Sequence, residues 1–207
     1  MGLLNLLTRD PLGFALVVIP LLFSVIIHEV AHGWVAYRMG DPTAKWSGRL
    51  SLNPLNHLDP IGTLMLFLAG FGWAKPVPVN FNNLSDRRKG LIFVSSAGIA
   101  VNILIAFIAQ FFIRLFSASS FEASLIPIHY VVQINIILAA LNLIPIPPLD
   151  GSKILTGILW ERTPYFLTRL EPYGFFIIIG LLYLGILDPL IGFFRWVIGT
   201  AIGVLLA

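Results

Sequence analysis

Several uninterrupted apolar stretches dominate this sequence, and their length decides what the chain can fold into. A helix that crosses a bilayer needs about 20 apolar residues, and Pro11–Tyr37, Leu91–Phe116 and Ile126–Leu143 reach or approach that length. Only 11% of the 207 residues are charged, whereas a soluble domain carries roughly 25%. These stretches stand too close together for separate water-soluble cores, so the sequence predicts an integral membrane protein.

Two further segments complete the expected membrane layout. Tyr173–Leu206 is longer than one span, and Gly185, Asp188 and Pro189 divide it into two helices, of which the first is short. Pro60–Trp73 has only 14 residues, three of them glycine, which suits a re-entrant segment better than a span. We therefore expect an all-α, polytopic membrane bundle of about five to six transmembrane helices. A short re-entrant or β-like segment would lie between the first and second core helices.

The positive charges favour one orientation of this bundle. If Pro60–Trp73 returns to the side from which it enters, 10 of the 13 Lys and Arg residues gather on one face. The positive-inside rule makes that face cytosolic. This layout has five spans, an outside N-terminus and an inside C-terminus, with Gly40–Lys45, Phe81–Gly90 and Thr163–Glu171 on the same side. Basic residues between apolar segments suit anionic lipid headgroups and argue against a nucleic-acid partner.

The chain is expected to form one membrane-embedded domain over residues 1–207. Its catalytic core would occupy about residues 11–160, and its C-terminal helices about residues 172–206. The first apolar stretch is too long for the apolar region of a signal peptide, which has about 7–15 residues. We therefore expect Pro11–Tyr37 to be retained as a helix.

The motif HEVAH in the first apolar stretch supplies candidate metal ligands and a candidate base. His28 and His32 are four residues apart, so both imidazoles lie on one face of a helix and can share a zinc ion. Glu29 is adjacent and can act as a general base on water at the metal. The alternative is two packed histidines beside a paired glutamate. A charged group in an apolar helix costs roughly 2.5–3.5 kcal/mol, however, which favours a catalytic role for Glu29.

A catalytic zinc ion uses three protein ligands and a water, and Asp150 is the candidate for the third ligand. The chain has no cysteine, so no thiolate can serve. Asp150 follows an apolar helix in the run NLIPIPPLDG, where Pro145, Pro147 and Pro148 prevent ordinary helix and Gly151 allows a turn. A broken element of this kind can aim a carboxylate into the membrane interior. A helix-ending Asp-Gly turn at the interface is the alternative.

The two motifs together resemble those of the site-2 protease family of intramembrane zinc metalloproteases. HExxH in an apolar helix is followed, 110 residues after its second histidine, by N-x-x-P-x-x-P-x-D-G. In this sequence the second motif consists of Asn142, Pro145, Pro148, Asp150 and Gly151. The resemblance runs from about Ile19 to Ile158, and it is to the compact form of the family, without a PDZ or CBS domain.

This resemblance implies one Zn²⁺ per chain, held by His28, His32 and Asp150, with Glu29 activating water. It implies membrane proteins or peptides as substrates, and an active site that opens to the cytosol from a prokaryotic plasma membrane. It also implies a catalytic core of three helices, here Pro11–Tyr37, Leu91–Phe116 and Ile126–Leu155.

Three more polar residues are candidates for contact with the substrate or a developing oxyanion. Asn142 and Asn102 each lie in an apolar helix and can donate a hydrogen bond to a carbonyl oxygen. A hydrogen bond between helices accounts for Asn102 equally well. His57, in the run SLNPLNHLDPIGT, can support or gate the site, although an interfacial histidine is more often structural.

The run GWAKPVPVN predicts a short strand with one usable edge. Pro76 and Pro78 lack an N–H, so Lys75, Val77 and Val79 present the donors. An extended substrate can add to such an edge. Protection of the edge by proline against aggregation is the alternative.

Two other functions use the same central residues. In a metal transporter or channel the two histidines and the aspartate would form a transit site, which needs further polar residues along a path through the membrane. In a catalytically idle homologue the same fold would act as a binding scaffold. The presence of both complete motifs favours the protease.

Overall fold

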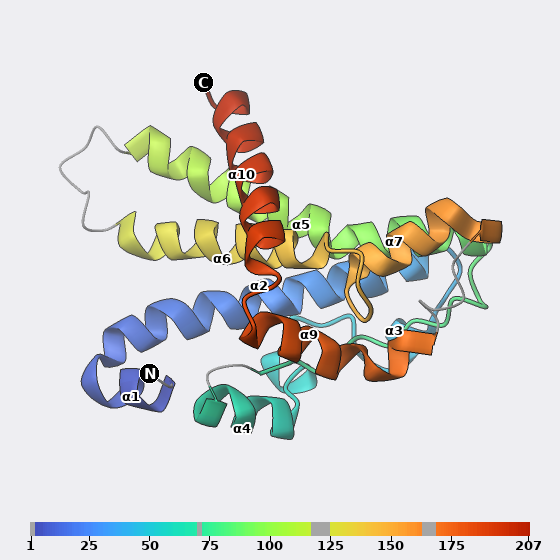
Figure 1. Ribbon diagram of the computed structural model, residues 1–207, viewed down its shortest axis with the longest axis horizontal. Helices are drawn as coiled ribbons and strands as arrows, with labels where there is room; N and C mark the ends of the chain where they lie inside the picture. Colours follow the sequence, from blue (N-terminus) through green and yellow to red (C-terminus); the bar gives the residue numbers. More distant parts are fainter. Residues whose placement is uncertain (1–2, 70–71, 117–124, 163–168) are drawn as a thin grey trace.

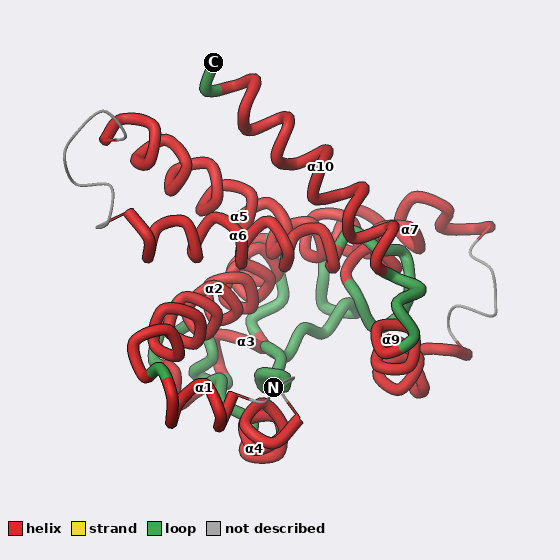
Figure 2. Tube along the Cα trace, turned by 60° about the vertical axis from the view of Figure 1, so that its left-hand side comes forward, coloured by secondary structure: helices red, strands yellow, loops and turns green. Residues whose placement is uncertain are grey.

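The computed structural model describes residues 3–69, 72–116, 125–162 and 169–207, and this part of the chain is helical and contains no β-strand (Figure 1, Figure 2). Three helices are long and apolar enough to cross a membrane: α2 (Pro11–Arg38), α5 (Arg87–Phe116) and α10 (Asp188–Leu205). Two apolar helices, α6 (Ile126–Asn142) and α9 (Gly174–Tyr183), are shorter. The prediction of an all-helical protein with helices long and apolar enough to span a membrane is confirmed for the described residues, while the number of spans and the re-entrant segment stay predictions.

The helix α2 has clear local causes for its start and its length. Asp10 precedes it and accepts a hydrogen bond on Oδ1 from the Gly13 N–H at 2.9 Å, while Pro11 occupies the first helical position. Its 28 residues extend about 42 Å at 1.5 Å per residue, beyond the ~30 Å of a hydrocarbon core. His28 and His32 lie in its C-terminal half.

The helices α2, α5 and α6 lie side by side and form the centre of the molecule (Figure 1, Figure 2). Small buried side chains, Ala106 and Ala109 on α5 and Ala139 and Ala140 on α6, line the contact between the last two. Such residues allow the backbones of membrane helices to approach closely. The buried face of α10 packs against the same cluster.

The third core helix is interrupted beside the site. The resemblance implied a core helix over Ile126–Leu155, which is wrong as one continuous helix, while the break that Pro145, Pro147 and Pro148 predicted is confirmed. The helix α6 ends at Asn142, residues 143–149 are irregular, and α7 (Asp150–Leu159) begins at the predicted ligand. The prolines of residues 143–149 explain the break, because each lacks an N–H and clashes with the preceding helical turn. The Nε of Arg88, in the first turn of α5, donates a hydrogen bond to the Gly157 carbonyl of α7 at 3.2 Å.

The connection between α2 and α5 contains only short elements. They are α3 (Thr43–Trp46), the 3-10 turn η1 (Pro54–Asn56) and α4 (Pro60–Ala69). An isolated antiparallel bridge joins Leu58 to Ala74, and the Lys75 N–H donates to the His57 carbonyl at 2.8 Å. The segment that contains α4 therefore begins and ends at neighbouring positions, Leu58 and Ala74. The helix α1 (Leu3–Arg9) also contacts α4.

The predicted short strand in GWAKPVPVN is not formed. Residues 75–80 carry no strand pairing. Two of the three edge donors are also used inside the chain, because the Lys75 N–H is bonded to His57 and the Val77 N–H donates to Glu29 Oε2 at 2.8 Å. The prediction of a free edge there is wrong for both residues.

Asp41 fixes this segment to the end of α2. It is fully buried, and its carboxylate accepts hydrogen bonds from Thr43 N–H, Asn80 N–H and the Asn83 amide at 3.1, 2.7 and 2.9 Å. The Thr43 hydroxyl donates a fourth at 2.5 Å. Burial alone would raise the pKa of Asp41, but these hydrogen bonds outweigh it and hold the pKa below its ordinary value.

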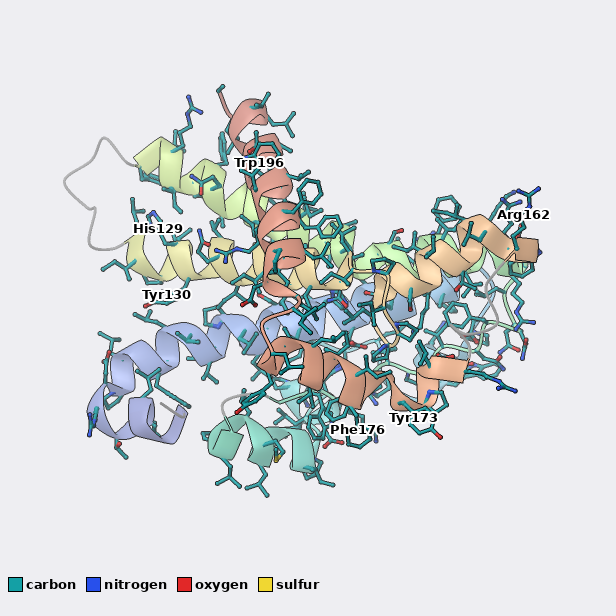
Figure 3. The ribbon with its side chains drawn as sticks, viewed as in Figure 1. His129, Tyr130, Arg162, Tyr173, Phe176 and Trp196 are labelled. Atoms are coloured by element: carbon teal, nitrogen blue, oxygen red, sulfur yellow. The ribbon has the colours of Figure 1, made fainter. Side chains whose placement is uncertain are left out.

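The helix ends that carry many of the Lys and Arg residues lie at one end of the bundle. The C-terminal end of α2, the short α3, the N-terminal end of α5 and the C-terminal end of α7 meet there (Figure 1). Arg162 lies at this end, while His129 and Tyr130 lie at the other end of the bundle, near the start of α6 (Figure 3). Most of Thr163–Glu171, the segment predicted to lie on the same side as Gly40–Lys45, is outside the described residues.

The C-terminal segment divides as predicted. The helix α9 ends at Tyr183, Gly185 has a φ of +70°, which favours glycine, and α10 begins at Asp188. Large apolar side chains project outward from both helices, as Phe176 and Trp196 show with exposed fractions of 73% and 66% (Figure 3). Such a surface suits hydrocarbon better than water.

Candidate metal centre

Two helices bring three predicted ligands together. His28 and His32 on α2 and Asp150 at the start of α7 are all buried, with 6–8% of each residue exposed. The Nε2 atoms of His28 and His32 lie 3.0 Å apart. Asp150 Oδ2 lies 3.1 Å from His28 Nε2 and 3.2 Å from His32 Nε2. The three atoms therefore form a nearly equilateral triangle.

This triangle fits a zinc ion. Tetrahedral zinc with bonds of about 2.0–2.1 Å separates its ligand atoms by roughly 3.3 Å, close to the three observed distances. Two neutral imidazoles and one carboxylate are ligands that zinc accepts in catalytic sites, where a fourth position stays open for water. Among the described residues, this is the group of His, Asp and Glu side chains arranged to hold a metal.

The helix α5 sets the position of both imidazole rings. His32 Nδ1 lies 2.7 Å from the Val94 carbonyl oxygen, so this nitrogen carries the hydrogen and Nε2 is free to bind a metal. The ring of His28 rests on Gly98. A Cβ at that position would come within 2.5 Å of His28 Nε2 and 2.6 Å of Nδ1, so only glycine leaves room for the ring.

The break between α6 and α7 sets the position of Asp150. The side chain belongs to the first turn of α7, where the partial positive charge of the helix end favours a carboxylate. Gly151 allows this end to approach the preceding turn closely. A Cβ there would lie 2.5 Å from the Leu143 carbonyl oxygen and 2.6 Å from that of Ile144. The glycine of the second motif is thus required for close packing and sits inside the helix.

A cavity of about 260 Å³ opens beside the triangle. Glu29 lines this cavity and is half-buried, with the Val77 N–H bonded to its carboxylate. The walls come from α2, α5, the 76–81 segment and the α6–α7 region, through Pro76, Val77, Val79, Phe81, Val94, Ser95, Asn142, Pro148 and Lys153. A group that could hold a metal, a carboxylate and a cavity are therefore adjacent, an arrangement that is compatible with hydrolysis.

The three further candidates lie in different places. Asn142 lines the cavity, with its amide donating to the Leu138 carbonyl at 3.0 Å. Asn102 is fully buried and is not among the residues lining the cavity. His57 is also fully buried and outside that lining, and its Nε2 lies 2.7 Å from the Ser51 carbonyl oxygen.

Sequence reasoning missed several residues that shape the site. Val94 and Gly98 act through a carbonyl oxygen and an absent side chain, which no side-chain motif reveals. Lys153 lies one helical turn after Asp150 on the same face, so the spacing of three residues could have indicated it. The contact from Val77 to Glu29 spans 48 residues and has no local signal.

Comparisons with known proteins agree with this chemistry. The sequence profile of peptidase family M50 matches residues 113–184, a range that includes Asp150 but not the two histidines. A Bacillus subtilis protein named "Putative zinc metalloprotease YwhC" is 41% identical over 171 residues, covering 79% of this chain and 78% of that protein. Proteins named "Putative zinc metalloprotease Rip2" from Mycolicibacterium smegmatis and Mycobacterium tuberculosis are 31% and 30% identical, over 82% and 92% of this chain and 67% and 76% of their own lengths. No solved structure matches the chain.

The matches extend across most of the chain and not only across its motifs. They agree with the resemblance noted from HEVAH and NLIPIPPLDG, and with a zinc-type ligand triangle. The chain belongs to peptidase family M50, the site-2 protease family.

Proposed function

We propose that this chain is an intramembrane zinc metalloprotease that hydrolyses peptide bonds of membrane-embedded or membrane-proximal proteins. The observation that carries the proposal is the triangle formed by His28, His32 and Asp150, with Glu29 at the wall of the adjoining cavity. The three relatives carry the words "Putative zinc metalloprotease" in their names, which supports the same reaction class.

The ligands of one Zn²⁺ per chain would be His28, His32 and Asp150. When bound, zinc supplies a Lewis acid that polarises a carbonyl oxygen and lowers the pKa of water to about 7. The Val94 carbonyl keeps the hydrogen of His32 on Nδ1, so that Nε2 offers its lone pair to the metal.

Glu29 is the general base in this proposal. Its carboxylate takes the proton from the attacking water and later delivers it to the leaving amine. The Val77 N–H bonds to Oε2 and leaves Oε1 to receive that proton. Asn142 in the cavity wall can donate a hydrogen bond to the carbonyl oxygen of the scissile bond as negative charge develops there.

Glu29→Gln tests the proposal, because glutamine has nearly the same volume but cannot accept the proton. We expect this variant to retain about one zinc per chain while losing nearly all hydrolysis. The assay compares new peptide N-termini in membranes of cells that express the wild-type chain or the variant. If the same fragments arise from both, Glu29 is not the base. If zinc-loaded wild type releases none and instead conducts metal ions across liposomes, the chain is a transporter.

We further propose five spans, with an outside N-terminus and the active site open to the cytosol of a prokaryotic cell. The bridge between Leu58 and Ala74 supports a re-entrant path for Pro60–Trp73, because both ends of that segment lie together. Since the chain has no cysteine, single cysteines can be placed at will and labelled from either side of sealed vesicles. Labelling of Phe81–Gly90 and Thr163–Glu171 from opposite faces would refute this layout.

A further inference from the structure

Four polar atoms in the three core helices are buried without a hydrogen-bond partner. They are Nδ1 of His28, Oδ1 and Nδ2 of Asn102, and Oδ1 of Asn135. Buried polar atoms are almost always paired in folded proteins, so a cluster of unpaired ones needs an explanation. The explanation begins with where these residues lie along the helices.

The helices α2 and α5 are antiparallel, and their contacts fix which residues lie opposite one another. His32 meets the carbonyl of Val94, and His28 meets Gly98. Moving four residues toward the N-terminus of α2, from His32 to His28, thus corresponds to moving four residues toward the C-terminus of α5, from Val94 to Gly98. One further turn places Asn102 next after Gly98 on the same face of α5.

The same turn of α2 carries Ser24, four residues before His28, and α6 contributes a polar group at this level. The amide of Asn135 donates a hydrogen bond to Ser24 Oγ at 2.8 Å. Ser24, Asn102 and Asn135 are all buried, with 4%, 0% and 0% exposed. Three helices therefore place one polar side chain each in a layer directly next to His28.

The Cα–Cβ bonds of Asn102 and His28 tilt toward each other along the two antiparallel helices. The Cα–Cβ bond of a helical residue tilts toward the N-terminus of its helix. The side chain of Asn102 is therefore directed along α5 toward Gly98, against which the His28 imidazole packs. His28 leans along α2 toward Ser24 and the polar layer.

The unpaired atoms are also chemically complementary. A ligating histidine that binds metal through Nε2 carries its hydrogen on Nδ1 and needs an acceptor there. Asn102 offers an acceptor, Oδ1, and two hydrogens on Nδ2, while Asn135 Oδ1 is an acceptor. Pairing His28 to Asn102 and Asn102 to Asn135 satisfies all four atoms and continues the observed bond to Ser24.

We infer that Asn102 is a positioning residue for the metal centre. In the zinc-bound protein its Oδ1 accepts the Nδ1–H of His28, which is unpaired in the structure, and fixes that ring as the Val94 carbonyl fixes His32. The inference rests on the proposed role of His28 as a zinc ligand, and it gives Asn102 a role behind the site, without contact to the substrate.

The test compares Asn102→Leu with Asn135→Leu, which replaces the same residue type at the same burial and the same level. The first removes the acceptor for His28, and the second leaves it. We expect Asn102→Leu to raise the zinc dissociation constant about 10- to 100-fold, and Asn135→Leu to change it less than about threefold. Chelator competition on the purified proteins in lipid nanodiscs measures both constants. Equal zinc affinity in Asn102→Leu and wild type, or equal losses in the two variants, would overturn the inference.

Nitrogen-15 NMR of the zinc-loaded wild type supplies a readout that does not depend on a variant that folds. The expected result is a solvent-protected proton on His28 Nδ1 with a nuclear Overhauser contact to the Asn102 amide. A His28 ring protonated on Nε2, or an Nδ1 proton that exchanges freely, would overturn the assignment. A wild-type chain that binds no zinc would instead refute the proposed metal centre itself.

Discussion

Replacing Gly98 by alanine tests whether α5 holds the His28 ring in its ligating position. The new Cβ would lie 2.5 Å from His28 Nε2 and 2.6 Å from Nδ1. Ordinary contacts between such atoms are about 3.5 Å, so the ring must move by about 1 Å. Metal–ligand bonds tolerate only about 0.2 Å of displacement, and a misplacement of about 1 Å at a reacting centre costs on the order of 10²-fold in rate.

Gly199→Ala in α10 is the matched control for Gly98→Ala. No atom lies within 4 Å of a Cβ at Gly199, so this variant gains only the ~0.5–1 kcal/mol by which alanine is favoured over glycine in a helix. The experiment measures zinc affinity by chelator competition, peptide hydrolysis and thermal unfolding for both proteins. We expect Gly98→Ala to fold but to lose about 10²-fold in activity together with zinc affinity. If its zinc affinity stays within about threefold of the control, the close approach of His28 to α5 does not position a ligand.

Three further predictions concern the residues around the centre. Asp150→Ala leaves two protein ligands, so zinc affinity and hydrolysis should fall together in metal analysis and peptide assays; full zinc content and turnover would place the third ligand elsewhere. Val77→Pro removes the N–H bonded to Glu29 and should lower turnover about tenfold with zinc retained; loss of folded protein would make that contact structural. Because the pKa of Asp41 is lowered in the folded chain, its ionised form stabilises the fold above the ordinary value of 3.8, and this contribution disappears as pH falls below it. Asp41→Ala should lower the free energy of unfolding by on the order of 2–4 kcal/mol at pH 7 and weaken its dependence on pH in the acid range. An unchanged dependence on pH in that range would contradict this account.

The boundaries of α2 follow from local chemistry, which is why the sequence predicted them closely. The predicted Pro11–Tyr37 and the observed Pro11–Arg38 differ by one residue, because a capping aspartate and a first-turn proline mark the start. The break at Gly185 and Asp188 was equally visible. Which helices lie in the membrane, and how often the chain crosses it, depend on surroundings that helix boundaries do not encode.

The candidate site was likewise predictable only in part from the sequence. HEVAH fixes the spacing of two ligands within one helix, and the proline-rich run marks Asp150. The sequence could not separate Asn142 from Asn102, because both are amides in apolar helices and only the packing shows which one faces the cavity. The predicted strand failed for a related reason, since the partner of the Val77 N–H is a glutamate on a distant helix.

Irregular backbone inside a membrane is tolerated only where protein or a polar cavity satisfies its polar groups. Two irregular segments of this chain, residues 75–80 and 143–149, border the same cavity beside the proposed zinc ligands. One binds the carboxylate of Glu29 through a backbone N–H, and the other delivers Asp150 at the start of a new helix. Peptide hydrolysis needs water and an unwound substrate, and neither is stable in hydrocarbon. A site built where two segments already depart from helix offers both a polar wall and exposed backbone, so the breaks in this fold belong to the chemistry that it is proposed to perform.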